Sequence, residues 1–338
     1  MSASDSRKSA LDTWALGRLK DRGLKLPGEF SLQPASDDAS FRRYFRYCGD
    51  PSFIFVDAPP AMEDSRPFIA VATLLASAGL NVPEVFEHDL DSGFMMIKDL
   101  GEDLYFDRLG DIAQTEQLYQ DAFIALSKMQ QISARLDPYD EVLLQNEMNL
   151  FPEWFLTRQL DIDCAEDMLE EVFRLMITNA TSQPQVFVHR DYHCRNLMLA
   201  QPNPGIIDFQ DAVIGPITYD LVSLLKDCYH KFPSDQIERW VMEYRTRLVM
   251  AGQLEASVSE KTFMRWFDFM GFQRHLKCAG IFSRLNLRDG KPGYLADIPL
   301  VLQYLSEVCE RYTELTAFGC WLQEVVIPRM GSTEYVRR

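Results

Sequence analysis

The chain has 338 residues, enough for two domains or lobes, and 47% of them are hydrophobic, as is typical of a compact globular protein. Its formal net charge of −16 argues against a nucleic-acid partner, because a phosphate backbone is bound by clustered lysines and arginines. The seven cysteines form no Cys-x-x-Cys pair and no apolar run approaches the roughly 18 residues of a membrane span, so we expect reduced thiols, no zinc site, no membrane partner and a cytoplasmic location.

The N-terminal third of the chain shows both helical and strand periodicity. Two helices and three strands are predicted there, with the helices over 7–22 and 63–78 and the strands over 41–47, 53–58 and 94–97. The last strand is followed by Lys98-Asp99-Leu100-Gly101, which breaks the apolar pattern. We therefore expect a small N-terminal lobe over 1–98 that hinges onto a larger C-terminal lobe over 99–338.

Helical periodicity dominates the remainder of the chain. Helices are predicted from Thr115 onward, and then over 165–180, 234–251, 258–287 and 296–322. Thr115 is expected to cap the first of them. Gly280 is a point at which the helix over 258–287 could be interrupted.

The most informative stretch is VFVHRDYHCRNLMLAQPNPGIIDFQD, residues 186–211. An apolar strand is followed by a polar loop with His189, Asp191 and Asn196, then by a turn and a second apolar step that ends at Asp208. Phosphoryl transfer requires such a set, because one carboxylate orients the attacking hydroxyl while a second carboxylate and a neutral oxygen ligand hold Mg²⁺ against the phosphates. His-Arg-Asp with an Asn five residues after the Asp is the pattern of a kinase catalytic loop.

The motif His189-x-Asp191-x-His193-x-x-Asn196, followed by Ile206-Ile207-Asp208-Phe209, resembles that of the aminoglycoside phosphotransferase family, a branch of the kinase-like fold that favours small-molecule acceptors. The match extends to Gly215-Pro216-x-x-Tyr219-Asp220-Leu221. Three further stretches resemble the bacterial members that phosphorylate cell-wall amino sugars: 41–46, 150–156 and 274–291. The resemblance covers nearly the whole chain and implies an α+β, bilobal, protein-kinase-like fold, with a small α/β N-lobe that binds nucleotide and a large, mainly helical C-lobe.

The resemblance also implies a reaction, namely transfer of the γ-phosphoryl group of ATP to the anomeric (C1) hydroxyl of N-acetylmuramate and N-acetylglucosamine in peptidoglycan recycling. Asp191 would orient the hydroxyl as the catalytic base, and Asn196 and Asp208 would bind Mg²⁺. His189 and Asp220 would brace the loop, although a helix N-cap role explains Asp220 equally well. The partner implied is a small-molecule amino sugar, with no obligate protein partner.

The nucleotide side departs from the kinase pattern at the third strand. Kinases carry a lysine there, whereas this chain has Asp57 in FIFVDAPP and no lysine between positions 26 and 97. Another cation must offset the phosphate charge, and we favour Arg43 over Arg42 and Arg46 on the preceding strand. The alternative is that these arginines shield an edge strand or pair with Asp57. The expected nucleotide contacts are Ser40, Arg42, Arg43, Ile97, Lys98 and Asp99.

The acceptor side is expected to combine an aromatic surface with basic residues. Trp154 could stack on a pyranose, although a buried core tryptophan is the competing interpretation. The stretch 265–291 is rich in Lys and Arg, which suits an anionic acceptor group such as a lactyl carboxylate, and a solvated helix face is the alternative. The expected acceptor contacts are Glu153, Trp154, His193, Gln210, Asp211, Arg274, Lys277 and Arg284.

Two other functions compete with the amino-sugar kinase. The first is a kinase of an aminoglycoside or another small alcohol, whose cationic substrates would favour an acidic lid in place of the basic stretch 265–291. The second is a nucleotide-binding pseudokinase that scaffolds a partner, suggested by the missing strand lysine and the glycine-free loop SDDAS. The intact Asp191, Asn196 and Asp208 argue against the pseudokinase.

Overall fold

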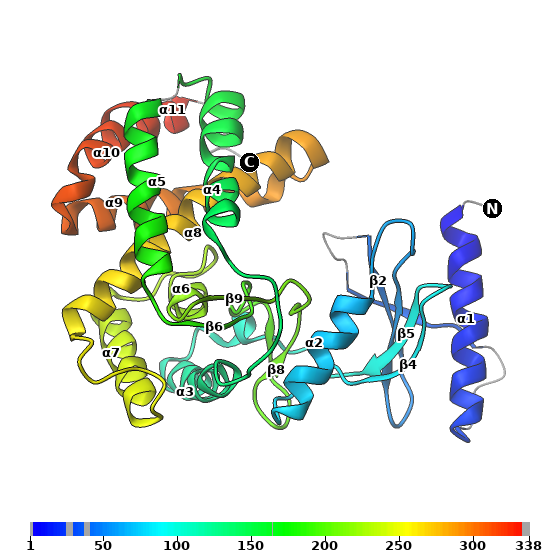
Figure 1. Cartoon of the computed structure of the whole chain (residues 1–338). Coiled ribbons are helices and arrows are strands. Elements are labelled where there is room, and N and C mark those ends of the chain that lie inside the picture. Colours follow the sequence, from blue (N-terminus) through cyan, green and yellow to red (C-terminus); the bar gives the residue numbers. More distant parts are fainter. Residues whose placement is uncertain (1–2, 25–29, 37–40, 164, 333–338) are drawn as a thin grey trace. The chain divides into compact units, whose positions relative to one another are not determined.

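The computed structural model describes residues 3–24, 30–36, 41–163 and 165–332 (Figure 1). The chain forms two compact units. Unit 1 contains residues 1–132 and 194–211, and unit 2 contains residues 133–193 and 212–338. The bounds of these units differ from those of the expected lobes, 1–98 and 99–338. Residues 99–132, which include a long helix over 112–129, and the stretch 194–211 belong to the same unit as the N-terminal sheet. The functional lobes themselves stay a prediction.

Unit 1 is built on a five-stranded antiparallel sheet with the order β1-β2-β3-β5-β4. The strands are β1 (Gln33–Ser36), β2 (Arg43–Tyr47), β3 (Phe53–Asp57), β4 (Val85–Asp89) and β5 (Phe94–Lys98). Helix α1 (Ala3–Asp21) and helix α2 (Arg66–Ser77) lie on opposite faces of this sheet (Figure 1). The predicted helices and strands of the N-terminal third are therefore confirmed.

The register of the sheet sorts its side chains between these two faces. Phe45 of β2 lies opposite Phe55 of β3, which in turn lies opposite Met96 of β5. All three are buried in one cluster with the apolar stripe of α1. That stripe consists of Leu11, Ala15 and Leu19. Because successive side chains of a strand alternate, the next residue along each strand points to the α2 face.

Unit 1 also contains a short 3-10 helix η1 (Tyr105–Arg108), helix α3 (Ile112–Met129) and a hairpin of β7 (Leu197–Met198) and β8 (Gly205–Ile206). The expectation that Thr115 caps α3 is wrong. The helix begins earlier, because the side chain of Asp111 accepts a hydrogen bond from the Gln114 N–H, and Thr115 is buried inside the helix.

Unit 2 joins a two-stranded antiparallel pair, β6 (Gln185–Val188) and β9 (Val213–Pro216), to a helical body. The helical elements are α4 (Glu141–Met148), η2 (Phe151–Gln159), α5 (Glu166–Thr181), α6 (Tyr219–Leu225), α7 (Ser234–Met250), α8 (Glu260–Asp289), η3 (Pro292–Asp297), α9 (Ile298–Arg311), η4 (Thr313–Leu315), α10 (Thr316–Trp321), η5 (Leu322–Val326) and α11 (Ile327–Ser332). Phe269, Phe272 and Leu276 of α8 are buried in the core of this unit. The expected α+β fold, with a small sheet-containing part and a mainly helical part, is confirmed.

The predictions for the helices of unit 2 had different outcomes. The helix predicted over 258–287 is confirmed: α8 is continuous through Gly280, which lies against the backbone of Leu150 and allows close packing there. The predicted helix over 296–322 is divided at Tyr312, whose backbone is extended with φ −125° and ψ 117°. Helix α4, which carries a residue of the candidate site, was not predicted.

Candidate functional site

The catalytic-loop motif is shared between the two compact units. The chain passes from unit 2 to unit 1 between His193 and Cys194, so Asp191 belongs to unit 2 and both Asn196 and Asp208 belong to unit 1. The surroundings of each part are therefore described separately.

In unit 2, the loop after β6 is held through its backbone. The N–H groups of His189 and Arg190 donate to the two carboxylate oxygens of Asp220, at 2.7 and 3.0 Å, from the first turn of α6. Arg190 has a φ of +78°, a conformation that costs a side-chain-bearing residue energy unless contacts fix it. Burial raises the pKa of Asp220 to about 7, against the lowering effect of the two N–H donors. Asp220 does not act through an N-cap bond, since the cap position of α6 is Thr218.

A second carboxylate, Glu147 of α4, holds the same loop through a side chain. Its Oε1 pairs with the guanidinium of Arg190 and, at 2.9 Å, with Nζ of Lys277 from α8. Its Oε2 accepts hydrogen bonds from the hydroxyl of Tyr139 and, at 3.4 Å, from Nε2 of Gln273. Burial opposes ionisation of Glu147, but Lys277 and Arg190 outweigh it and lower its pKa. Sequence patterns did not reveal Glu147, because no local spacing links it to residues so far along the chain.

The surroundings of Asp191 favour its ionised form. Burial works against ionisation, but the charges of Lys277 and Arg274, together with the neighbouring histidines, lower the pKa of Asp191. The N–H of Asp191 donates to Nδ1 of His189 at 3.3 Å, so that nitrogen is the acceptor atom of the ring. An ionised carboxylate at this place can accept a hydrogen bond from a hydroxyl and orient it.

Two of the three basic residues expected at the acceptor are buried and do not belong to a solvated helix face. Arg274 and Lys277 are only 5% and 8% exposed, which contradicts that alternative for both. Lys277 also donates to the hydroxyl of Tyr219 at 3.1 Å, in addition to its pair with Glu147. The guanidinium of Arg274 lies 3.9 and 3.7 Å from the sulfur atoms of two buried cysteines, Cys228 and Cys278. Arg284 is half-buried.

The other expected acceptor residues of unit 2 lie on separate elements. His193 is buried, and its ring packs edge-to-face on that of Tyr229, with centroids 5.4 Å apart. Trp154 of η2 is half-buried, and the guanidinium of Arg158 lies 4.1 Å from its ring centroid. The same arginine pairs with the exposed Glu153 at 3.0 Å. Trp154 is therefore neither a buried core residue nor a bare stacking surface.

In unit 1, the two predicted metal ligands lie side by side. Nδ2 of Asn196 is 3.3 Å from Oδ2 of Asp208, and Gln210 donates to the other carboxylate oxygen, Oδ1, at 2.7 Å. Asp208 is exposed, like Asp211, and has a φ of +63°. A carboxylate and an amide oxygen suit a hard cation such as Mg²⁺, so the donor set fits. The described residues contain no group of three or more His, Cys, Asp and Glu that could hold a metal ion by itself.

The expected nucleotide residues of unit 1 are mostly engaged in ion pairs. Arg43 pairs with Asp57, so the alternative interpretation of this arginine is the one observed. Arg42 pairs with Glu63 at 3.3 Å. Arg46 pairs with Asp99 at 2.7 Å, directly after β5.

The remaining nucleotide residues include two backbone candidates at the end of β5. Ile97 is buried in that strand, and Lys98 donates to Oδ1 of Asn81 at 2.8 Å. Ser40 lies outside the described residues.

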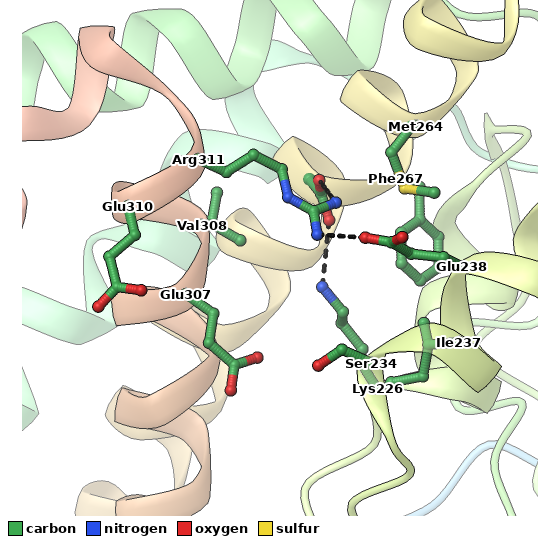
Figure 2. Close-up of a pocket in the computed structure, with 11 residues that line it drawn as sticks. Lys226, Ser234, Ile237, Glu238, Met264, Phe267, Glu307, Val308, Glu310 and Arg311 are labelled. Carbon is green, nitrogen blue, oxygen red and sulfur yellow. Dashed lines mark hydrogen bonds and ion pairs between the residues drawn. The ribbon is translucent and has the colours of Figure 1, made fainter.

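Unit 2 also contains a pocket of about 340 Å³ (Figure 2). In it, Lys226 and Arg311 both pair with the buried Asp268, at 3.1 and 3.0 Å, and Arg311 also pairs with Glu238. The lining is completed by Ser234, Ile237, Met264, Phe267, Glu307, Val308 and Glu310. None of these is a predicted site residue, and the charged groups at its floor are already paired with one another. The motif, and not this pocket, therefore identifies the reaction.

Comparison with known proteins bears on both fold and chemistry. Residues 31–255 match the model of the phosphotransferase enzyme family. The chain is 44% identical over 294 residues to the N-acetylmuramate/N-acetylglucosamine kinase of Pseudomonas aeruginosa, covering 85% of this chain and 86% of that one. It is also 44% identical over 301 residues to the protein of that name from Pseudomonas putida, covering 87% and 88%.

Solved structures of similar fold include the ADP-bound aminoglycoside phosphotransferase APH(2'')-Ib. The two share a TM-score of 0.56 and 14% sequence identity, over 88% of this chain and 99% of the other. The fold implied by the sequence motif is thereby confirmed. Among the described residues, no helix is both long and apolar enough to cross a membrane.

Proposed function

This chain belongs to the phosphotransferase enzyme family, and we propose that it transfers the γ-phosphoryl group of ATP to the anomeric hydroxyl of N-acetylmuramate and N-acetylglucosamine. The observation that carries the proposal is 44% identity, over 85% of the chain, to a kinase named for these two sugars. The reaction would serve peptidoglycan recycling in the cytoplasm, where ATP is made.

Each residue of the motif has a role in this proposal. Asp191, kept ionised by nearby positive charge, orients the sugar hydroxyl by accepting its hydrogen bond. Asp220 and Glu147 hold the loop that carries it, one through backbone N–H groups and one through Arg190. A base with ordinary or lowered pKa is sufficient, because a loose transition state needs little activation of the nucleophile.

Asn196 and Asp208 would hold Mg²⁺ through their side-chain oxygens. The bound ion would offset the charge of the nucleotide phosphates. Gln210 fixes the orientation of the Asp208 carboxylate by donating to its Oδ1 at 2.7 Å. Backbone groups of Ile97 to Asp99 would contact the adenine edge.

In this proposal an arginine of α8 binds the lactyl carboxylate of N-acetylmuramate. Lys277 is paired with Glu147 and Tyr219, which leaves it less suited to bind a lactyl group. Arg274 donates to two cysteine sulfur atoms and forms no ion pair with a carboxylate among the described residues, so it and Arg284 are the better candidates from α8. Trp154, Glu153, His193 and Asp211 remain candidate contacts to the sugar.

The test is an acceptor assay with ATP and Mg²⁺. We expect turnover with N-acetylmuramate and N-acetylglucosamine, and much lower turnover with aminoglycosides or choline at equal concentration. A preference for a cationic acceptor would support the competing small-alcohol kinase. A protein that binds ATP but phosphorylates none of these acceptors would support the pseudokinase.

A further inference from the structure

The chain lacks a lysine on β3, so another cation must face the nucleotide phosphates if the proposed function holds. Three arginines are candidates on the preceding segment: Arg42 directly before β2, and Arg43 and Arg46 within it. They differ in which face of the sheet they occupy and in the groups to which they are already bound. Unit 1 contains all of the residues needed to distinguish them.

Arg43 lies on the face covered by α1. It is directly opposite Asp57 in the register of β2 and β3, next to the buried pair Phe45 and Phe55. Asp57 has no exposed surface, and its other oxygen pairs with Arg7 of α1. The guanidinium of Arg43 is therefore neutralised in a cluster beneath α1, and this cluster explains why an aspartate is tolerated inside the sheet.

Arg42 lies on the opposite face, which α2 covers. Its guanidinium carbon is 5.9 Å from the ring centroid of Phe68 on α2. The Phe68 ring packs on that of Phe209, with centroids 5.0 Å apart. Phe209 directly follows Asp208, the predicted metal ligand. This row of contacts thus connects Arg42 to the segment that carries Asp208, the predicted metal ligand.

Glu63 fixes the direction of Arg42. Its Oε2 lies 3.3 Å from Nη2 of Arg42, and its Oε1 accepts a hydrogen bond from the Phe41 N–H at 3.2 Å. The side chains are 5% and 17% exposed, so the ion pair is shielded from bulk water. In such surroundings a charge interacts more strongly with a phosphate than it would at an open surface.

Arg46 shares a face with Arg42 but lies at the other end of β2. Its guanidinium is bound to Asp99 and Glu102 and donates to the carbonyl of Gly101 at 2.8 Å. The guanidinium of Arg46 is therefore bound to the segment after β5, and Arg46 is a weaker candidate for phosphate binding.

We propose that Arg42, directed by Glu63, is the residue that binds the phosphate chain of the nucleotide, and that Arg43 has a structural role beneath α1. This assignment rests on the proposed function, because it presumes a nucleotide at Asn196 and Asp208. It reverses the expectation from sequence, which favoured Arg43.

The experiment measures the dissociation constants of ADP and of adenosine for the full-length protein with Mg²⁺. A phosphate ligand affects ADP alone, whereas a general loss of structure affects both compounds. We expect Arg42→Met to raise the dissociation constant of ADP about 10- to 100-fold, the range for a charge-assisted hydrogen bond. The dissociation constant of adenosine should stay unchanged. Arg43→Met should leave the ratio of the two constants unchanged and lower the melting temperature, because Asp57 then keeps only Arg7. Arg66→Met, at an exposed position of α2, is the matched control.

Arg42→Gln is a second variant, which can still form a hydrogen bond with Glu63. If Arg42→Met does not fold, the ADP and adenosine constants of Arg42→Gln test the assignment. An unchanged ratio in the folded Arg42 variants would overturn the assignment. A reduced ADP affinity in Arg43→Met alone would move the role to Arg43. Failure of the proposed function is distinguishable, since the wild-type protein would then phosphorylate neither sugar, whatever its affinity for ADP.

Discussion

Asp191 and Asp208 carry the same chemical group in different surroundings. Asp191 lies near Lys277 and Arg274, which lower its pKa against the effect of burial, whereas Asp208 is exposed beside Asn196. The first environment suits a group that orients a hydroxyl, and the second suits a group that meets a cation from solvent. The two carboxylates should therefore respond differently to the loss of charge.

We expect Asp191→Asn to reduce kcat by several powers of ten while ATP affinity stays close to that of the wild type. Asp208→Asn should instead abolish the dependence of ATP affinity on Mg²⁺. Titration of ATP into both variants, with and without Mg²⁺, separates the two effects. The division of roles is wrong if both variants lose the same ATP affinity.

Sequence spacing sufficed for the residues of the motif and failed for their partners. The pattern from His189 to Asp208 is local, and so the residue types alone predicted it. Glu147 reaches the same loop from α4, and no local pattern connects them. Alternation correctly separated Arg42 from Arg43, but the face that α1 covers depends on packing over long sequence distances, which the sequence did not reveal.

At the scale of elements, helix α8 illustrates how a glycine can support a helix. A Cβ atom at Gly280 would lie 2.4 Å from the backbone carbon of Leu150, next to η2. The absence of a side chain therefore allows the two helical segments to approach closely. The sequence left an interruption open at this position because glycine lowers helix propensity, but the helix over 258–287 was predicted and is observed as continuous.

Gly280→Ala should lower the free energy of unfolding, because overpacking against a backbone costs about 1 to 3 kcal/mol and the gain in helix propensity is only about 1 kcal/mol. Gly271→Ala is the matched control in the same helix, since its Cβ would meet Val222 Cγ1 at an ordinary 3.5 Å. The control should be neutral or slightly stabilising. Urea unfolding of both variants measures the difference, and equal stabilities would contradict the packing argument.

At the scale of the whole molecule, His275 links folding to pH. Its ring is fully buried, stacks on Tyr304 with centroids 4.8 Å apart, and donates from Nε2 to the Lys226 carbonyl at 2.9 Å. Burial lowers the pKa of His275 to about 3, from 6.5 in the unfolded chain. Between these values the unfolded state binds the proton more readily, so stability is present above pH 6.5 and is lost as the pH falls toward 3.

We expect protonation of this histidine to lower the free energy of unfolding by at most about 4 to 5 kcal/mol as the pH falls from 6.5 to 3. His275→Gln keeps a donor for the Lys226 carbonyl but cannot titrate, so its stability should depend less on pH between about 4 and 6. Urea unfolding at several pH values tests this, with the exposed His88→Gln as the control. If the free energy of unfolding changes with pH to the same extent in the wild type and in His275→Gln, the buried ring is not the cause of the acid sensitivity.

The central claim concerns the product as well as the class of reaction. One carboxylate such as Asp191 can orient either an anomeric or a primary hydroxyl. The contacts that orient the bound sugar must therefore select which hydroxyl faces the γ-phosphate. Phosphorus NMR of the product formed from N-acetylmuramate, ATP and Mg²⁺ tests this most directly. We expect a signal coupled to the anomeric proton. A signal coupled to the C6 methylene protons, or no phosphosugar at all, would contradict the account.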